Sequence, residues 1–227
     1  MKNQVITQSL IKELFEYTNK GGCGLQFAAK YIHGIEFPSS DAMKLGQWFE
    51  FMCTGQPTKF GHIPEPVRLK AKKLTKTELD EGMKQEDVVG ALSKKYQDAL
   101  IQVERFKRML DYYKYEVVDT GMRIIDKELN IQGDIDLVVK KKGSGKDGKL
   151  SFIDMKFSGL LENKWDDLGW ADDALEYKDK IMIQAVHYKM VGRANLGYEP
   201  DFYFWVFSST NTTDCKNIKV IVDDETF

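Results

Sequence analysis

Two short stretches of the chain alternate acidic and apolar residues, and this alternation most constrains what the chain can fold into. They are residues 133–139, GDIDLVV, and residues 152–156, FIDMK. In a β-strand, side chains two residues apart lie on the same face. The alternation therefore predicts two strands, the first with Asp136 on its polar face and the second with Asp154 and Lys156 on its polar face.

The segment between these strands predicts their alignment. Its sequence, KKKGSGKDGK, is typical of a hairpin loop. A hairpin that is symmetric about Gly145 would place Asp136 directly across from Asp154. Two carboxylates and the ammonium of Lys156 would then meet on one polar face of an otherwise apolar sheet.

The rest of the chain predicts helices first and then strands around one further helix. The fold class that we expect is α/β (α+β), a mixed central sheet flanked by helices, with a helical lobe at the N-terminus. We expect one domain over residues 1–227, mainly helical over 1–113 and with the sheet core over 114–227. The expected helices are 10–15, 25–33, 42–53, 85–113 and 174–193, and the expected strands are 115–125, 128–139, 150–157, 202–207 and 218–222.

Composition excludes several classes of protein. No apolar run approaches the length of a membrane span, so we expect no membrane partner. Three widely separated cysteines fit a reducing compartment better than a disulfide framework. We therefore expect a cytoplasmic protein, in the host cytoplasm if a phage encodes it.

The net charge of -2 means that any contact with DNA must use local basic patches. One patch is Arg68, Lys70, Lys72 and Lys73, which precedes a long helix expected to frame a groove. The second patch is the lysine-rich hairpin loop. The alternative for both patches is a solvated surface that binds nothing.

The acidic residues predict a metal site. Paired carboxylates repel one another, and burying them is costly without a counter-charge. Oxygen ligands favour Mg²⁺ or Mn²⁺, and such an ion activates water for attack on a phosphate. The alternative is a simple salt bridge between Lys156 and Asp154.

Four short motifs occur in the order that one nuclease family shows. They are GQWFE ending at Glu50, GDID ending at Asp136, DMK over residues 154–156, and QAVHY from Gln184 to Tyr188. With these motifs the chain resembles the PD-(D/E)XK nuclease superfamily, in the branch of RecB-type nucleases and phage recombination exonucleases. The resemblance implies a restriction-endonuclease-like core.

The resemblance also implies roles for these residues. Asp136, Asp154 and the backbone carbonyl of Met155 would ligate the metal, and Glu50 would complete the site or hold a second ion. Gln184 and Tyr188, four apart on one helix face, would orient the catalytic lysine and contact a DNA phosphate. The alternatives are a solvent-exposed acid at position 50 and an ordinary packed helix surface for the other two. The implied catalytic set is Glu50, Asp136, Asp154, Lys156, Gln184 and Tyr188.

The activity implied by the resemblance is a Mg²⁺- or Mn²⁺-dependent deoxyribonuclease. We expect an exonuclease that acts on DNA ends in phage-type recombination, replication or repair, with a single-strand-annealing or recombination protein as a candidate second partner. A structure-specific endonuclease and a non-catalytic DNA-binding or virion protein are the alternatives. An iron–sulfur cluster is not expected. Relatives that carry one hold it with one early and three late cysteines, whereas Cys215 is the one late cysteine here.

Two further expectations concern residues between and within these motifs. Trp165 and Trp170 could stack on an unpaired base, or pack against the core. His187 is expected to lie at the surface rather than to bind a metal.

Overall fold

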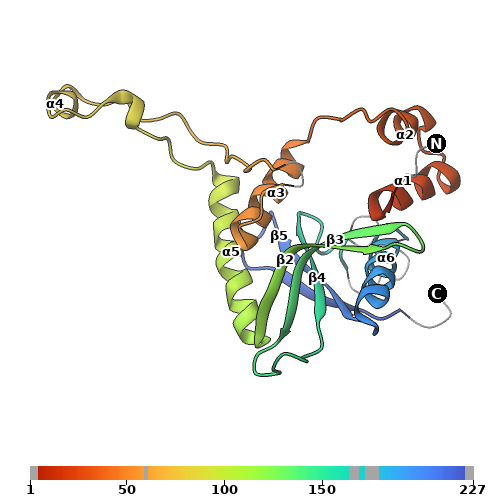
Figure 1. The fold of residues 1–227 in the computed structure, drawn as a ribbon. Helices are drawn as coiled ribbons and strands as arrows, with labels where there is room; N and C mark the ends of the chain where they lie inside the picture. The colour runs from red at the N-terminus through yellow and green to blue at the C-terminus, as the bar shows by residue number, and fades with distance from the viewer. Residues whose placement is uncertain (1–4, 59–60, 164–168, 172–178, 223–227) are drawn as a thin grey trace.

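The computed structural model describes residues 5–58, 61–163, 169–171 and 179–222. Within these ranges a six-stranded mixed sheet forms the centre, and helices lie on both of its faces (Figure 1). This arrangement confirms the predicted fold class. The strands are β1 (Ile6–Thr7), β2 (Tyr115–Asp126), β3 (Ile131–Lys141), β4 (Ser151–Ser158), β5 (Asp201–Ser208) and β6 (Cys215–Val220). The helices are α1 (Gln8–Asn19), α2 (Gly24–Tyr31), α3 (Asp41–Thr54), α4 (Lys76–Asp80), α5 (Lys94–Tyr112) and α6 (Asp179–Leu196), with a 3₁₀ turn at Gln85–Asp87.

Strand β3 is the strand around which the sheet is organised. It pairs with β2 in antiparallel fashion along its whole length. Its other edge is shared by two strands: β1 pairs in parallel at residues 131–132, and β4 pairs in antiparallel fashion at residues 137–139. Residues 133–136 of β3 therefore face a gap in the sheet between β1 and β4.

The register of the β3–β4 hairpin is the one predicted from its loop. Leu137 lies opposite Ile153, and Val139 lies opposite Ser151, so the hairpin is symmetric about Gly145. Gly145 itself has a φ of 72°, a left-handed conformation that glycine adopts at little cost.

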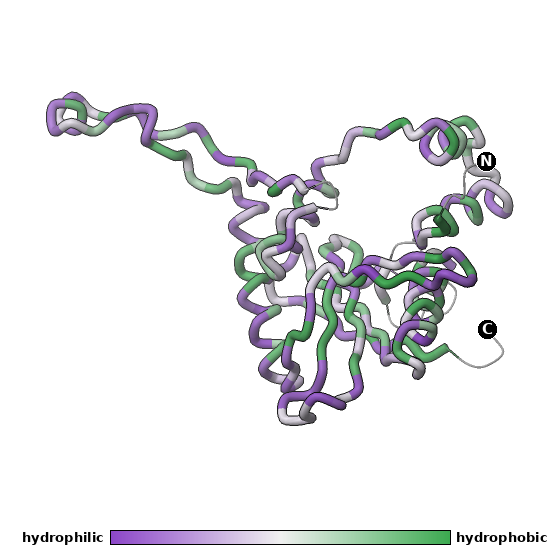
Figure 2. The backbone as a smooth tube through the Cα atoms, viewed as in Figure 1, coloured by the Kyte–Doolittle hydropathy of each residue, from purple (hydrophilic) through white to green (hydrophobic). Residues whose placement is uncertain are grey.

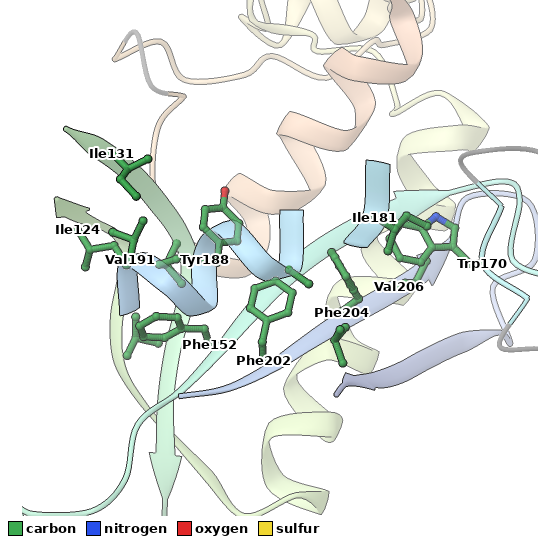
Figure 3. Packing of buried hydrophobic residues seen from close by; sticks show 14 of the residues in the cluster. Ile124, Ile131, Phe152, Trp170, Ile181, Tyr188, Val191, Phe202, Phe204 and Val206 are labelled. Atoms are coloured by element: carbon green, nitrogen blue, oxygen red, sulfur yellow. The ribbon is translucent and has the colours of Figure 1, made fainter. Parts of the chain in front are cut away.

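One face of the sheet packs against α6. Phe152 and Phe202 from the sheet form an apolar cluster with Tyr188 and Val191 from the helix (Figure 3). The face that carries the acidic residues is thus apolar over most of its area, and it is polar only beside the gap in the sheet.

The opposite face packs against α3 and α5. Phe49 from α3 and Phe106 from α5 join Leu137 and Ile153 in a second apolar cluster. Successive residues of β3 and β4 point to opposite faces, and so Leu137 and Ile153 lie on the face away from α6.

Local signals in the sequence set the ends of α3. The side chain of Ser40 accepts a hydrogen bond from the backbone N–H of Met43 at 3.2 Å, which caps the first turn. Gly55 ends the helix with a φ of 73°. These caps fix the position along the chain at which Glu50 is presented to the sheet.

A long arm, residues 61–93, projects from the body between α3 and α5 and carries α4 near its tip (Figure 1). The prediction of one helix over residues 85–113 is wrong at its N-terminal end. The backbone N–H of Leu69 donates to the carbonyl of Ala91 at 2.8 Å, and a Cβ on Gly90 would lie 1.8 Å from the carbonyl oxygen of Leu69. This close antiparallel pairing holds the segment extended, and α5 begins only after it.

Two other predicted boundaries differ from the structure. The second strand was expected to begin at Glu128, but residues 127–130 form a turn in which Asp126 accepts the backbone N–H of Glu128 at 2.9 Å. The expected start of the last helix, Ala174, lies outside the described residues. Within the described ranges, no helix is long and apolar enough to cross a membrane.

Candidate active site

The candidate site lies where β3 and β4 part. Backbone pairing between the two strands ends at Leu137 and Ile153. Beyond this pair, the backbone N–H of Met155 donates instead to Oδ2 of Asp136 at 2.8 Å; Asp136 is one residue from Leu137, and Met155 is two residues from Ile153. A buried N–H group needs a partner, and the carboxylate supplies one, so the strands can part without leaving it unsatisfied.

Asp154 is the most buried acid of the site, with 2% of its surface exposed. Its Oδ1 accepts a hydrogen bond from Nε2 of Gln184 on α6, and its Oδ2 forms an ion pair with Nζ of Lys156. The salt bridge that was the simple alternative is therefore present. It does not exclude a metal site, because the same contacts hold Asp154 and Lys156 beside Asp136.

Tyr188 lies one helical turn after Gln184, and its ring packs directly on β3. A Cβ on Gly133 would lie 2.9 Å from Cδ1 of this ring, closer than real Cβ atoms come. Figure 3 shows the hydroxyl of Tyr188 directed away from the apolar cluster beneath it. Glycine in the GDID motif thus allows α6 to approach the strand that carries Asp136.

Glu50 reaches the site from α3, on the other side of the gap. It lines two cavities. One, of about 480 Å³, also contains Lys156 and Gln184. The other, of about 270 Å³, also contains Asp136 and Tyr188. Glu50 therefore stands between the two halves of the site and is not the solvent-exposed acid of the alternative interpretation.

The charges of the site act strongly on one another. Burial raises the pKa of Asp136 well above its ordinary value, and the charges of Asp154 and Glu50 raise it further. Burial also raises the pKa of Glu50, although Lys156 lowers it. Burial would lower the pKa of Lys156, but the neighbouring carboxylates raise it above its ordinary value. Acids that are costly to ionise without a cation are suited to binding one.

The chemistry of the donors fits a hard cation. Among the described residues, no three acidic, histidine or cysteine side chains converge closely enough to enclose a metal ion by themselves. However, Oδ2 of Asp154 is buried, and its partner is the ammonium of Lys156. Carboxylate oxygens of Glu50, Asp136 and Asp154 are ligands of the kind that Mg²⁺ and Mn²⁺ prefer.

Burial also affects Tyr188. It raises the pKa of the phenol well above its ordinary value, and the charges of Asp154 and Asp136 add to the effect. The hydroxyl therefore keeps its proton at neutral pH and can donate a hydrogen bond to an anion.

The structure does not bring the predicted basic patch to this site. Arg68, Lys70, Lys72 and Lys73 all lie on the arm and are exposed. The arm carries as many acidic as basic residues, and Nζ of Lys72 donates to Glu78 at 3.1 Å. Figure 2 shows that hydrophilic and hydrophobic residues alternate along the arm.

The hairpin lysines lie at the opposite end of β3 and β4 from the acids. Nζ of Lys140 donates to the carbonyl of Gly145 at 3.0 Å, and Lys142 pairs with Asp111 at 2.8 Å. These lysines are bound to their own part of the fold.

Two aromatic expectations are decided in part. Trp170 is 5% exposed and packs against Phe204 with 5.1 Å between ring centroids, so it belongs to the core; Trp165 lies outside the described residues.

The expectation of a surface position for His187 is wrong. Its ring is 3% exposed, and Nε2 lies 2.8 Å from the backbone carbonyl of Gln132.

The structure adds one residue that sequence reasoning missed. Lys12 on α1 donates a hydrogen bond from Nζ to Oε1 of Gln184 at 2.7 Å and lines the larger cavity. A single lysine on an amphipathic helix carries no signal in the sequence, because its partner is 172 residues away.

The fold and the site together define a class. A mixed sheet flanked by helices, with acids where two antiparallel strands part, is a restriction-endonuclease-like α/β arrangement. Comparison with protein-family models gave no match, and comparison with curated proteins gave none.

Comparison with solved structures gave a match over nearly the whole chain. The matching protein, from Eubacterium rectale, has a crystal structure at 2.19 Å and is described as a "Putative exonuclease". The TM-score is 0.60 at 16% sequence identity, and the similarity covers 99% of this chain and 74% of that protein. At this identity the likeness shows a shared fold.

Proposed function

We propose that the chain is a Mg²⁺- or Mn²⁺-dependent DNA nuclease of the PD-(D/E)XK superfamily. We further propose that it is an exonuclease acting on DNA ends in phage-type recombination, replication or repair. The observation that carries the proposal is that Asp136, Asp154 and Lys156 lie together where β3 and β4 part, with the charge of Glu50 acting on Asp136 from α3. The fold shared with a protein described as a "Putative exonuclease" supports it.

Each side chain has a role that follows from its contacts. Asp136, Asp154 and the backbone carbonyl of Met155 would hold the ion, and Glu50 would complete the site or hold a second ion; the metal when bound activates water and neutralises charge on the phosphate. Lys156, next to Asp154, would orient the attacking water and stabilise the negative charge of the transition state. Gln184 would keep Asp154 in place through the bond from its Nε2, and Tyr188 would donate its hydroxyl proton to a phosphate oxygen.

The cell compartment is part of the same proposal. Cys23, Cys53 and Cys215 are all free thiols, as a reducing compartment would keep them. We propose that the protein acts on DNA in the cytoplasm.

The test is a cleavage assay with linear, nicked and covalently closed circular DNA and with linear RNA, each with Mg²⁺ and with excess chelator. We expect loss of linear DNA from its ends, with the closed circle intact and no activity in chelator. The Asp154→Asn variant is the control for contaminating nucleases. Cleavage of the closed circle would indicate the endonuclease alternative, and a wild-type chain that binds DNA without cutting any substrate would contradict the proposal.

A further inference from the structure

We infer that α1 is part of the active site and that Lys12 is a positioning residue for Asp154, acting through Gln184. This inference rests on the proposed function. Nζ of Lys12 donates to Oε1 of Gln184 at 2.7 Å, and Nε2 of the same amide donates to Oδ1 of Asp154. The contacts form a continuous chain from α1 through α6 to β4.

The two outer groups of this chain specify the orientation of the amide between them. An ammonium can only donate hydrogen bonds, and an ionised carboxylate can only accept them. The amide of Gln184 must therefore turn its oxygen to Lys12 and its NH₂ group to Asp154. Removing Lys12 takes away the partner that holds the oxygen end, and the side chain of Gln184 gains freedom to leave Asp154.

The orientation of Asp154 matters because its two oxygens have different tasks. Oδ1 is held by Gln184, whereas Oδ2 is buried and faces the ammonium of Lys156. Fixing Oδ1 directs Oδ2 toward the side where Lys156 lies. Partners that orient a ligand in this way typically contribute a factor of about 10–100 to metal affinity or activity.

The fold explains how a residue so early in the chain reaches the site. Strand β1 directly precedes α1 and pairs with β3, with Ile6 opposite Ile131. Strand β3 also carries Asp136, so α1 is anchored to a strand of the site itself. The side chain of Thr7 caps α1 by accepting the N–H of Leu10 at 3.3 Å, which fixes where the helix starts and hence where Lys12 points.

Two other roles for Lys12 would predict different results. If its charge only binds a DNA phosphate, DNA affinity falls but metal affinity does not. Loss of a nearby positive charge would by itself strengthen binding of a divalent cation. If Lys12 only attaches α1 to α6, the melting temperature falls and the metal site is unchanged. A decrease in metal affinity when Lys12 is removed is therefore a result that neither alternative predicts.

The test measures Mn²⁺ affinity of the full chain by calorimetry, without DNA, alongside the Mg²⁺ concentration that gives half-maximal cleavage. We expect Lys12→Met and Gln184→Met each to weaken Mn²⁺ binding by about 10-fold. The double variant should be no weaker than the single ones, because both changes break one chain. Lys12→Arg keeps the charge and the donor and should restore most of the affinity.

The matched control is Lys44→Met, which makes the same substitution at an exposed lysine on α3. It should leave Mn²⁺ affinity unchanged or slightly tighter. Melting curves accompany every variant, and Lys12→Ala replaces Lys12→Met if that variant does not fold.

Unchanged or tighter Mn²⁺ binding in Lys12→Met, or additive losses in the double variant, overturns the role of Lys12. If the wild-type chain binds Mn²⁺ but cleaves nothing, the nuclease proposal fails while the affinities still decide the role of Lys12. A wild-type chain that binds no Mn²⁺ overturns both.

Discussion

Asp136 accepts a hydrogen bond from the backbone N–H of Met155, with 2.8 Å between Oδ2 and the nitrogen. This side-chain contact lies just beyond the last backbone pair of β3 and β4, which is Leu137 with Ile153. One carboxylate thus ends the pairing of the strands and also borders the space where the other charged groups meet. The effect of replacing Asp136 on stability should therefore be separable from its effect on cleavage.

The first prediction concerns the two residues on β4. Lys156→Met and Asp154→Asn should each lower the cleavage rate by at least about 100-fold, the scale found when a group that stabilises transition-state charge is removed. The fold should persist, since both changes keep the shape of the side chain. Cleavage rate and melting temperature are measured on the same samples. A variant that cuts at the wild-type rate would exclude that residue from the site.

The second prediction concerns Asp136→Asn. Burial and like charges raise the pKa of Asp136, so its ionised form destabilises the folded state above that pKa. In metal-free protein at pH 8 the neutral amide should raise the melting temperature by about 2–4 °C, which corresponds to roughly 1 kcal/mol for a chain of this size. This increase in melting temperature over the wild type should become smaller as pH falls, because Asp136 in the wild type then becomes protonated.

The same variant also tests metal binding. Mg²⁺ should stabilise the wild-type chain, because a ligand that binds only the folded state contributes about 2.7 kcal/mol at 100 times its Kd. Asp136→Asn should lose most of this effect together with cleavage. Equal Mg²⁺ stabilisation of both proteins would mean that Asp136 does not ligate the ion.

The third prediction concerns the contact between β3 and α6. Gly133→Ala places a Cβ 2.9 Å from the ring of Tyr188, and overpacking of this kind typically costs about 1–3 kcal/mol. Urea unfolding should show the loss, and cleavage should fall because Tyr188 is displaced. Gly46→Ala is the matched change, since nothing lies within 4 Å of a Cβ there. That change should stabilise α3 by about 0.4–1 kcal/mol.

The fourth prediction concerns His187. Burial lowers its pKa, an effect that the hydrogen bond to the carbonyl of Gln132 partly offsets. The unfolded chain therefore takes up a proton first, and the folded state loses stability as pH falls below the ordinary histidine value of about 6.5. His187→Gln can still donate to that carbonyl but does not titrate. The stability of wild type relative to this variant should decline from pH 7 to pH 5, and a constant difference would contradict the prediction.

The fifth prediction concerns the arm. If it binds DNA, changing Arg68, Lys70 and Lys72 to alanine weakens binding to all sequences. The slope of the logarithm of DNA affinity against the logarithm of salt concentration should become shallower by roughly 0.9 for each DNA phosphate that these side chains no longer neutralise. The control variant also loses three positive charges, but at the hairpin end of the sheet, where Lys142, Lys146 and Lys149 are changed to alanine. Equal behaviour of the two triple variants would show that the arm is a solvated surface.

The sequence predicted the parts of the site that depend on short-range geometry. Alternation in β3 and β4 placed Asp136, Asp154 and Lys156 on one face, because a strand has a period of two residues. The loop midpoint gave the register, and the spacing of four between Gln184 and Tyr188 put them on one face of α6. A serine before an acidic first turn gave the start of α3.

Where the sequence failed, contacts between distant segments had overruled the local pattern. Helical spacing continued through Gly90, yet pairing with Leu69 keeps that residue in the arm. His187 was expected at the surface, and packing of α6 on β3 buried it. In both cases the deciding partner lies on another element, which periodicity along one segment cannot reveal.

By itself, then, the sequence determined most of the strands and helices and the line of charged residues, since these follow from the nearest few residues, whereas β1 and α4 were not predicted. Only the tertiary structure decided that β1 and β4 share one edge of β3 and leave a gap between them. It likewise decided that Glu50 and Lys12 reach this gap from α3 and α1. The physical reason is that burying the apolar faces of the sheet and the helices fixes their relative positions. The carboxylates come together as a consequence of that packing, because their mutual repulsion opposes it.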